Sequence, residues 1–339
     1  MMPNPLRIAT FNLENLDDRP GETPSIDERI AVLRPQLLRL DADILCLQEI
    51  NAQPGVEGEF REMRALDRLL EDTLYAGFHR ALTHGRHHPG PADVHNLAVL
   101  SRAPIIRHDQ LWHDLVPPPL YRPVSIDPPA EAEIPVEWDR PILHTEVSLE
   151  NGAGKPGQIL HVVNLHLRSP LASFIPGQKI DAFTWKSVSA WAEGFFLAAI
   201  KRNGQALEAR MLLDRLFDAD PKALVVVTGD FNADMREAPI RAILGEEEDT
   251  GNGELAARSM VAVERSLPEE QRFSVLHHGR KVMLDHMLVS KQLMGFYRHV
   301  EIHNESLEDE LVAFATVSHS PESFHAPVVA QFDLGEKAG

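Results

Sequence analysis

An acid and an amide follow the most apolar strand-like run of the sequence. The run is Leu224–Val227, Gly229 ends it, and Asp230 and Asn232 come next, two residues apart. Because side chains two residues apart on an extended segment point to the same side, we expect Asp230 and Asn232 to project together from a buried strand. A carboxylate can hold a metal or accept a proton from water, and an amide can donate to phosphate. A strand followed by an ordinary Asx turn explains the same pattern, so other segments have to decide.

Five further polar residues stand at or beside the ends of apolar, strand-like segments. They are Asn12, Glu49, His166, Asp285 and His325. One such residue would carry no weight, but six segments with this arrangement indicate a sandwich of sheets whose strand ends converge on a polar site. The residue types suit hydrolysis of a phosphate ester, which requires neutralising the phosphate, aligning a water in line and handling the leaving oxygen.

The elements that must position these side chains alternate between strands and helices. Apolar runs predict strands at Leu6–Phe11, Asp43–Gln48, Asn96–Leu100, Ile105–Leu111, Ile142–Leu149, Ile159–His166, Leu224–Val227, Val282–Val289 and Phe324–Phe332. Helices are predicted after the capping box Ser25–Glu28, at Glu62–Leu74, over 185–217 with Gly204 as a break or joint, and near Ala238–Leu244. The stretch 113–141 is predicted to be a surface loop, since seven prolines fall between Pro117 and Pro135.

Composition indicates one globular domain over residues 1–339, with its core between residues 6 and 332. Hydrophobic residues make up 43% of the chain, and no linker or repeat divides it. The longest apolar runs are too short to span a membrane, and the first residues lack a signal-peptide core. The single cysteine, Cys46, lies in an apolar run, which fits a buried thiol and a cytoplasmic location. A net charge of −18 argues against a broad basic surface for nucleic acid, although a nuclease can approach phosphate through a bound cation.

Six short motifs carry a resemblance to a known family. In chain order they are Thr10–Asn15, Leu47–Glu49, Asn164–Leu167, Gly229–Asp234, Leu284–His286 and Ser323–Val328. Their types and order resemble the endonuclease/exonuclease/phosphatase superfamily, from residue 6 to about residue 332. The resemblance implies an α/β fold, a four-layer αββα sandwich of two packed mixed β-sheets flanked by helices. It also implies a divalent-metal phosphodiesterase or phosphatase site at one edge of the sheets.

The chemistry and the resemblance together give these residues roles. Glu49 is the first choice as a ligand for Mg²⁺, with Mn²⁺ as a substitute, because Mg²⁺ takes few carboxylates plus water and substrate oxygens. Asn12 would hold that glutamate or a metal-bound water, and Glu14 would be a further outer ligand. Asp230 would orient or deprotonate the attacking water, while Asn232 steadies the phosphate.

Histidines would handle the phosphate and the leaving group. The resemblance implies that Asp285 orients His325, and an acid that fixes the tautomer of a histidine makes it a better proton handler. His166 would contact the phosphate or assist the leaving group, and Arg168, two residues on, would share its side of the strand. Asn96 opens another strand and is a candidate contact to the phosphate.

Each of these residues also has an ordinary structural explanation. Asn12 can cap a turn, Glu49 can pair with an arginine, and His166 can be a buried histidine with its hydrogen bonds satisfied. Structural and functional explanations are evenly matched for Glu14, Asn164 and Arg168, and Asn96 can simply begin its strand.

One departure from the family pattern concerns the last motif. The family has Asp immediately before its final histidine, whereas this chain has Phe324, and this puts a second metal position in doubt. The pairing of Asp285 with His325 does not depend on that acid. His319 is a weaker alternative to His325, because no Ala-Pro-Val strand follows it.

Five histidines crowd the stretch 79–95. A second metal site there is disfavoured, since no carboxylate has ligand-like spacing. A loop that meets substrate phosphate through Arg86, or an ordinary polar loop, explains the stretch better.

The sequence leaves the substrate open. The first hypothesis is a Mg²⁺-dependent phosphodiesterase or nuclease acting on DNA, RNA or a nucleotide-like ester, with no protein partner implied. The alternative within the same chemistry is a phosphatase of a small phosphorylated metabolite or lipid headgroup, which the acidic composition and the lack of an obvious basic groove leave open. An inactive binding module would be expected to lack Glu49, Asp230, Asn232 or His325, and this chain has all four.

Overall fold

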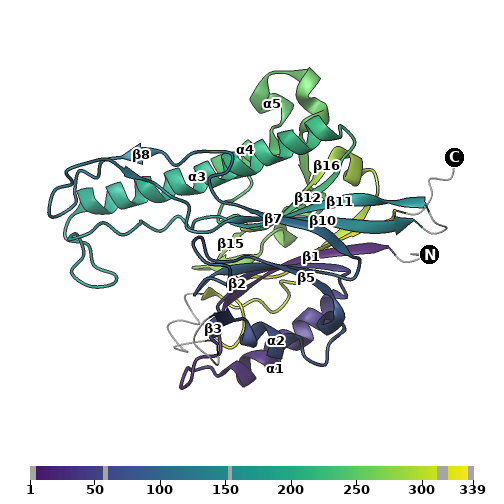
Figure 1. Ribbon diagram of the computed structural model, residues 1–339, viewed down its shortest axis with the longest axis horizontal. Coiled ribbons are helices and arrows are strands. Elements are labelled where there is room, and N and C mark those ends of the chain that lie inside the picture. The colour runs from purple at the N-terminus through teal and green to yellow at the C-terminus, as the bar shows by residue number, and fades with distance from the viewer. Residues whose placement is uncertain (1–4, 56–59, 152–154, 311–319, 335–339) are drawn as a thin grey trace.

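Two mixed six-stranded sheets pack face to face, and helices cover the outside of each (Figure 1). The computed structural model describes residues 5–55, 60–151, 155–310 and 320–334. The arrangement is the four-layer αββα sandwich that the motifs imply, so this prediction is confirmed. Among the described residues, no helix is long and apolar enough to cross a membrane.

The first sheet has one parallel pair of strands at its centre. Its order is β17 (Tyr297–Ile302), β18 (Val328–Phe332), β1 (Leu6–Leu16), β2 (Ile44–Ile50), β6 (Asn96–Ser101) and β5 (His79–Leu82). β1 and β2 run parallel, and the other neighbours are antiparallel. The end of β1 and the end of β2 therefore meet at the same edge of the sheet.

The second sheet has the same arrangement. Its order is β13 (Met260–Ala262), β16 (Asp285–Ser290), β12 (Leu224–Asp230), β11 (Lys155–His166), β10 (Ile142–Asn151) and β7 (Ile105–Leu111). β11 and β12 are parallel, and the remaining neighbours are antiparallel. The ends of β11 and β12 likewise share one edge.

Three apolar layers hold the sandwich together. The layer between the sheets takes Leu224 and Val226 from β12, while Val225 and Val227 point outward to the helices of the second sheet. This alternation is why the run is apolar throughout, as expected of a strand buried on both faces.

Different helices cover the two sheets. The first sheet packs against α1 (Ile26–Leu40) and α2 (Arg64–Leu70), and the second against α3 (Val188–Ala219) and α4 (Ala238–Leu244). The capping box at Ser25 is present, with the hydroxyl accepting from Glu28 N and the glutamate accepting from Ser25 N. The helix predicted at Glu62–Leu74 is shorter, and a 3₁₀ turn at Leu74–Gly77 follows it.

The prediction that Gly204 breaks the helical stretch 185–217 is wrong. α3 is one continuous helix of 32 residues that runs through Gly204. A Cβ at this position would lie 2.1 Å from the ring of Trp138, so the glycine makes room for the indole rather than ending the helix. A glycine in a helix interior costs roughly 1 kcal/mol against alanine, and tertiary packing overrides that preference here.

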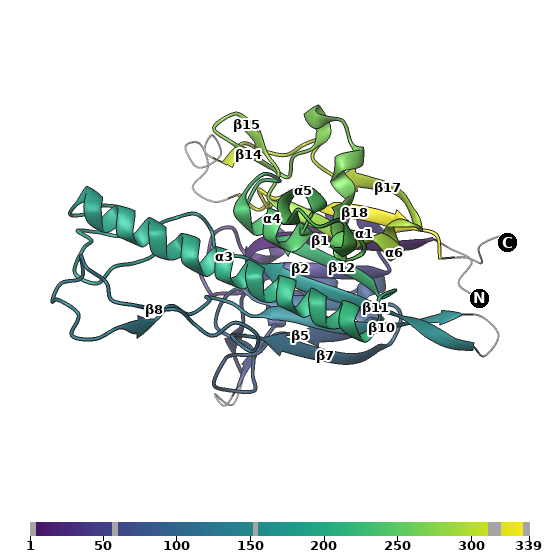
Figure 2. The same ribbon diagram turned by 90° about the horizontal axis from the view of Figure 1, so that it is seen from above.

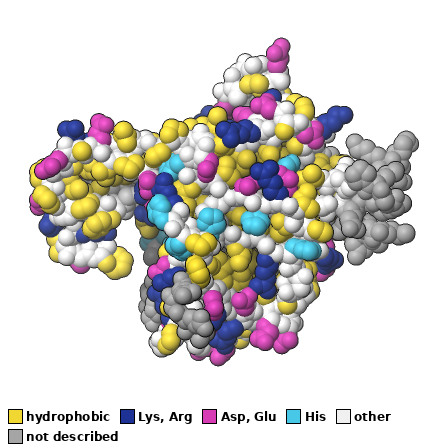
Figure 3. All heavy atoms as spheres, in the orientation of Figure 1, with side chains coloured by type: hydrophobic (Ala, Val, Ile, Leu, Met, Phe, Trp, Pro, Cys, Tyr) yellow, Lys and Arg dark blue, Asp and Glu magenta, His cyan; other side chains and the backbone are white. Residues whose placement is uncertain are grey.

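The first half of α3 projects from the sandwich and forms an arm with the segment 113–141 (Figures 1 and 2). That segment is mostly loop, as predicted, with two-residue strands β8 (Leu120–Tyr121) and β9 (Ile134–Pro135). A small apolar cluster around Val136, Ile175 and Leu197 packs inside the arm, and Glu193 of α3 accepts hydrogen bonds from Tyr121 and from Val124 N. Many of its apolar side chains are exposed, and Phe183 is 91% exposed (Figure 3). The arm therefore contributes little to the core that positions the strand ends.

Short elements complete the chain. They are β3 (Gln53–Pro54), β4 (Arg61–Glu62), β14 (Val275–His277), β15 (Arg280–Val282), α5 (Glu247–Thr250), α6 (Lys291–Met294) and 3₁₀ turns at Gly253–Arg258, Val263–Ser266 and Glu269–Gln271. The strand predicted at Val282–Val289 is divided between β15 and β16, so that Asp285 opens β16 instead of lying within a strand. The strand predicted from Phe324 begins later, at Val328.

Candidate active site

Six strand ends, three from each sheet, bring their polar side chains together at one edge of the sandwich. Asn12 Nδ2 donates to Asp230 Oδ2 at 3.0 Å and to Glu49 Oε1 at 3.2 Å. His166 Nε2 lies 3.3 Å from Asp230 Oδ2 and 3.6 Å from Glu49 Oε1. Contacts between residues that lie 37 to 218 positions apart in the chain thus form a compact amide, carboxylate and imidazole group.

A bulge in β2 turns Glu49 toward this group. Leu47 and Ile50 both belong to the apolar layer under α1 and α2, so the residues between them, Gln48 and Glu49, break the alternation of a regular strand. The pairing of β2 with β6 shifts its register between Leu47 and Ile50, and Glu49 has a left-handed φ of 58°. Without the bulge, the carboxylate of Glu49 would point into the helical layer.

A buried polar bridge behind the bulge ties the two sheets to each other. Gln48 Nε2 donates to Asn164 Oδ1 at 2.7 Å, and Asn164 Nδ2 donates to the carbonyls of Leu47 and Ala98. All the hydrogen-bonding groups of the Asn164 amide are engaged in this bridge. The structural explanation therefore accounts for Asn164 fully.

The end of β12 passes unusually close to β11. A Cβ on Gly229 would lie 1.9 Å from the carbonyl oxygen of Leu165, and Gly229 has a φ of 137°, so only glycine fits. Beyond it, Asn232 N donates to Asp230 Oδ1 at 2.8 Å and Asn232 Nδ2 donates to Asp230 Oδ2 at 3.0 Å. The amide of Asn232 also donates to the carbonyl of Leu167 at 3.1 Å, which fixes the Asp230 carboxylate.

His325 and Asp285 form a pair from different sheets. His325 Nδ1 lies 2.8 Å from Asp285 Oδ2, and Ser323 Oγ, which accepts from His325 N, donates to the Asn12 carbonyl. The Asp285 carboxylate, with help from Asp230 and Glu49, raises the pKa of His325 well above its usual value against the opposing effect of burial. The imidazole is therefore held in its charged form by an acid that also fixes its orientation.

His166 has the opposite electrostatic environment. Complete burial lowers the pKa of His166 well below its usual value, and the neighbouring Arg140 and His95 add to the effect. The Nε2 atom faces two carboxylates, so it carries the proton of the neutral ring. His166 Nδ1 has no hydrogen-bond partner among the residues that the structure describes.

Burial also changes the acids of the group. It raises the pKa of Asp230 to about 7, with His325 lowering it and Asp285 raising it further. Burial raises the pKa of Glu14 to about 7 too, although Phe324 N donates to Glu14 Oε2 at 2.7 Å. Both carboxylates therefore change protonation state near neutral pH.

Other predicted residues lie at the margin. Arg168 Nε lies 3.3 Å from Asp139 Oδ2, at the rim beside His166. Asn96 is buried, and its amide bonds to the carbonyls of Ile50 and Ala92 and to Ala92 N, so nothing of it faces the carboxylates. The structure thus brings Arg168 near the group but leaves Asn96 inside the fold.

The remaining candidates fall outside the group. Arg86 Nη1 is paired with Glu137 at 2.5 Å and lies over the Trp112 ring, which ties the histidine-rich stretch to the segment 113–141. His319 lies outside the described residues. Phe324 is buried, with its backbone N–H bound to Glu14.

Two residues near the site, Arg140 and His95, were not given roles from the sequence. Arg140 Nη2 lies 3.1 Å from His95 Nδ1, and Arg140 Nη1 donates to the carbonyl of Leu167 at 3.2 Å. His95 Nε2 contacts Asn15 Oδ1 at 2.9 Å. Arg140 has no sequence signal, because it lies in the proline-rich segment 113–141. His95 is one of five histidines in the stretch 79–95, and its spacing does not distinguish it from the others.

The donor set fits a hard divalent cation. Glu49, His166 and Asp230 each offer a ligand atom within 4.8 Å of the others, and Asp230, Asp285 and His325 form a second such group. Asp285 Oδ1 is buried without a hydrogen-bond partner in the described part of the chain. Carboxylates beside an amide are oxygen donors of the kind that Mg²⁺ and Mn²⁺ bind.

Comparison with known proteins agrees with this geometry. The model of the endonuclease/exonuclease/phosphatase family matches residues 9–306. The chain belongs to this family. Its members are hydrolases of phosphate esters, and the polar edge of the sandwich is therefore the candidate active site. No curated protein is significantly similar to this chain in sequence.

Solved structures share the family fold at low sequence identity. A family member from Bacteroides vulgatus has a TM-score of 0.55 at 15% identity, covering 98% of this chain and 99% of that chain. A mannosyl-6-phosphatase from Bacteroides thetaiotaomicron has a TM-score of 0.55 at 15% identity, covering 97% and 100%. A 3′ phosphatase from Neisseria bound to a product DNA hairpin has a TM-score of 0.50 at 16% identity, covering 97% and 99%. These similarities establish the fold alone.

Proposed function

We propose that the chain is a Mg²⁺-dependent hydrolase of phosphodiesters, with DNA or RNA as the substrate class and Mn²⁺ as a substitute ion. The observation that carries the proposal is the meeting of Glu49, Asp230 and Asp285 with two histidines of opposite charge state. Opposed pKa shifts within one polar group are typical of acid and base pairs in hydrolases.

Glu49 is the proposed principal metal ligand. Asn12 Nδ2 and Asn15 N donate to its two carboxylate oxygens, at 3.2 and 3.0 Å, and so hold its orientation. Glu14 is a proposed outer ligand. When bound, the cation would add its positive charge to that of His325 and of the arginines at the rim, and so neutralise the phosphate.

Asp230 is the proposed base. A carboxyl group with a pKa of about 7 is well matched to accepting a proton from water near neutral pH. Asn232 holds the Asp230 carboxylate by two hydrogen bonds and is the proposed contact that steadies the phosphate. The two residues would thus align the water and the phosphorus in line.

The two histidines have distinct proposed tasks. His325, charged through Asp285, would donate a hydrogen bond to a phosphate oxygen and stabilise negative charge as it develops. His166, neutral and close to both carboxylates, would contact the phosphate near the leaving oxygen. Arg168 is a proposed rim contact to phosphate, and Asn96 has no place in the set because its amide is engaged by backbone.

The acidic composition favours a second candidate substrate class. A net charge of −18 gives little long-range attraction for a polyanion, whereas a small phosphorylated metabolite or lipid headgroup needs only the local site. The structural similarity to a mannosyl-6-phosphatase is consistent with that class.

A substrate panel tests both candidates. The purified protein would be assayed with Mg²⁺, with Mn²⁺ and with a chelator on plasmid DNA, single-stranded DNA and RNA, a bis-aryl phosphate and several phosphomonoesters. We expect cleavage of the diesters that disappears with chelator and returns with either ion. Cleavage of monoesters alone would select the phosphatase, and activity that survives exhaustive chelation would refute the metal role.

A matched pair of variants ties the activity to Glu49. Glu49→Gln keeps size and shape but removes the charge, so activity should fall by at least about 10²–10³-fold. Glu62→Gln changes an exposed glutamate of β4 and should leave activity as it is. Circular dichroism would establish that both variants are folded.

A further inference from the structure

Two histidines and a glutamate gather on the outer face of the second sheet, away from the candidate active site. His144 and Glu146 lie two residues apart on β10, and His161 lies opposite Glu146 on β11. They share a face with Ile142, which packs toward α3. His161 precedes His166 by five residues, a distance of roughly 16 Å along the strand, so this cluster is separate from the catalytic edge.

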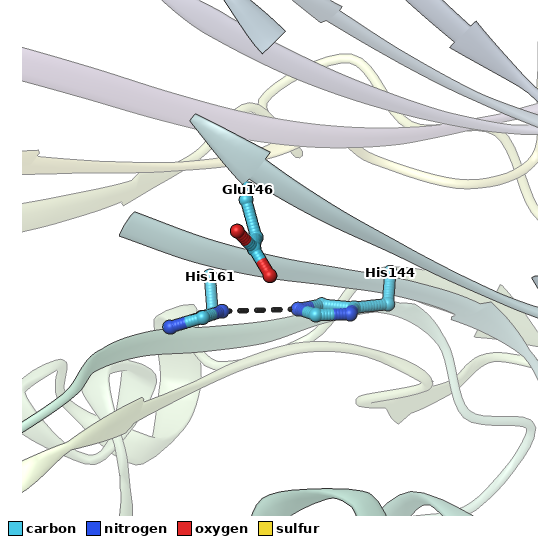
Figure 4. A group of neighbouring side chains, drawn as sticks. All are labelled: His144, Glu146 and His161. Carbon is cyan, nitrogen blue, oxygen red and sulfur yellow. Dashed lines mark hydrogen bonds between the residues drawn. The ribbon is translucent and has the colours of Figure 1, made fainter. Parts of the chain in front are cut away.

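The three side chains converge on one point. His144 Nε2 and His161 Nδ1 are 3.1 Å apart, and the carboxylate of Glu146 points toward the space between the rings (Figure 4). One ligand atom from each residue lies within 4.8 Å of the others. Two imidazole nitrogens that bind one zinc ion tetrahedrally stand roughly 3.3 Å apart, given Zn–N distances of 2.0–2.1 Å. The histidine pair is therefore already at ligand spacing.

Glu146 is free to complete the set. Its ion pair among the described residues is a distant one, 3.9 Å from Arg107 Nη1, and its side chain is only partly buried. Arg107 has a closer partner in Asp109, whose Oδ2 lies 2.8 Å from Arg107 Nε. If the Glu146 side chain rotated toward the imidazoles, Arg107 would therefore still have Asp109 as its carboxylate partner.

The surroundings favour a cation. Asp109 lies opposite His144 on β7, and Asp220 at the end of α3 raises the pKa of His161. Among the described charged side chains that act on the two histidines, Arg107 is the one cation, and it lowers the pKa of His144. Burial nevertheless leaves the pKa of both histidines lowered, that of His144 to about 4, so both rings are neutral at pH 7. Neutral imidazole is the form that binds metals.

We propose that His144, Glu146 and His161 form a binding site for a divalent transition-metal ion of the zinc class, which clamps β10 to β11. Two imidazoles and one carboxylate are a zinc ligand set with a fourth position left for water, whereas Mg²⁺ and Ca²⁺ prefer oxygen donors alone. When the ion binds, the single proton shared by Nε2 of His144 and Nδ1 of His161 moves to the outer nitrogen of its own ring.

Metal binding in the presence of excess Mg²⁺ tests the site. Equilibrium dialysis with Zn²⁺ or Co²⁺ should give one more bound equivalent for the wild type than for His161→Gln. Loss of one of three ligands should weaken this binding by at least about 10–100-fold. Bound Co²⁺ should also show the intense visible absorption of tetrahedral coordination, and the variant should lack it.

Matched variants separate the cluster from other histidines and from the active site. Glu146→Gln, a change of nearly equal volume at a partly exposed position, should lose the ion as His161→Gln does. His108→Gln, which alters an exposed histidine of the neighbouring β7, should retain it. Glu49→Gln should also retain it, because that residue belongs to the other site.

Thermal unfolding gives an independent measure. Zn²⁺ should raise the melting temperature of the wild type and of His108→Gln, since an ion that binds only the folded state stabilises it. It should not raise that of His161→Gln or Glu146→Gln, while phosphoester hydrolysis with Mg²⁺ stays unchanged in both. Equal zinc binding and equal stabilisation in wild type and cluster variants would overturn the proposal.

Discussion

The two sheets have the same pattern of parallel and antiparallel neighbours, and their candidate site residues come from equivalent positions. Each has a central parallel pair, β1 with β2 and β12 with β11, flanked on both sides by antiparallel strands. Three equivalent pairs meet across the sandwich, and each joins one residue from either sheet. They are Asn12 with Asp230, Glu49 with His166, and His325 with Asp285.

The likeness extends to the backbone that follows Asn12 and Asp230. Glu14 N donates to Asn12 Oδ1 at 2.9 Å, and Asn232 N donates to Asp230 Oδ1 at 2.8 Å. Glu14 and Asn232 have left-handed φ values of 48° and 47°. The same Asx turn therefore follows Asn12 within β1 and Asp230 at the end of β12.

The difference lies in the chemistry at equal geometry. In two pairs the first sheet supplies an amide or an imidazole and the second sheet a carboxylate, whereas in the third pair Glu49 of the first sheet faces His166 of the second. Two identical edges would place like charges against each other, which costs free energy in a buried site. Because the equivalent positions of the two sheets hold different residue types, each carboxylate faces an amide or an imidazole instead.

The largest effect should come from separating His325 from Asp285. His325→Ala and Asp285→Asn should each lower turnover by about 10²–10⁴-fold, because a charged imidazole and the acid that holds it act as a unit. The double variant should be little worse than the more damaged single one. Rates would be measured under single-turnover conditions with folding checked by circular dichroism, and additive losses would show that the pair works as two separate groups.

The next effect concerns Asn12 and Asp230. Asn12→Ala removes the donor that holds two carboxylates, so turnover and the apparent affinity for Mg²⁺ should fall by about 10–100-fold. Asn12→Asp makes the position like its counterpart in the other sheet and should be worse than Asn12→Ala, because it adds a third buried acid. Metal titrations of activity would measure both, and a harmless Asn12→Asp would refute the charge argument.

The two Asx turns should differ in their response to pH. The pKa of Glu14 is raised from 4.5 to about 7, so between these values the folded state binds more protons than the unfolded state. The free energy of unfolding without metal should therefore fall as pH rises from about 4.5 to 7, by on the order of 1–2 kcal/mol for this half-buried group. Chemical denaturation of wild type and Glu14→Gln would isolate the contribution, since Asn232 at the equivalent position cannot titrate.

If Glu14 has its ordinary pKa in the folded protein, the two denaturation series should run parallel across this range. Asp230 and His325, whose pKa values are also raised, remain in both proteins and cancel from the difference.

The smallest effect should distinguish the helical layers. Ser25 caps α1 with a reciprocal capping box, whereas Ser187 caps α3 by accepting from Ala190 N alone, out on the arm. Ser25→Ala should lower the free energy of unfolding by about 1 kcal/mol. Ser187→Ala should cost less than half of that, because the first turn of α3 frays without opening the core. Equal losses in urea denaturation would show that the arm unfolds together with the sandwich.

Much of the fold followed from periodicity and from turn residues. The apolar runs of β12 and β7 and the capping box of α1 lie where the sequence predicts them. Packing between distant segments could not be predicted from local sequence patterns. Gly204 is an example, because its role depends on Trp138, which lies 66 residues away in the chain.

The sequence indicated residues of the candidate site, but it did not indicate the geometry that brings them together. The sequence placed Glu49 at a strand end, but the bulge that turns it inward depends on pairing with β6 and could not be read from Leu47–Ile50. Arg140 and His95 have no local sequence signal. Arg140 lies in a loop and His95 directly precedes β6, and only the tertiary fold brings the two residues close to His166. The opposed charge states of His166 and His325 follow from burial and neighbours, which are properties of the folded chain.

The position of β18 has a consequence for the order in which the protein is made. β18 is inserted between β17 and β1, with Phe332 opposite Leu6, so the edge of β1 is covered by a strand that is made more than 300 residues later. Until then β1 has an unpaired edge, which is prone to join other chains, and His325 has not reached Asp285. If His325 has the proposed role, a truncated chain that ends before residue 320 should be inactive, because it lacks the contact with Asp285.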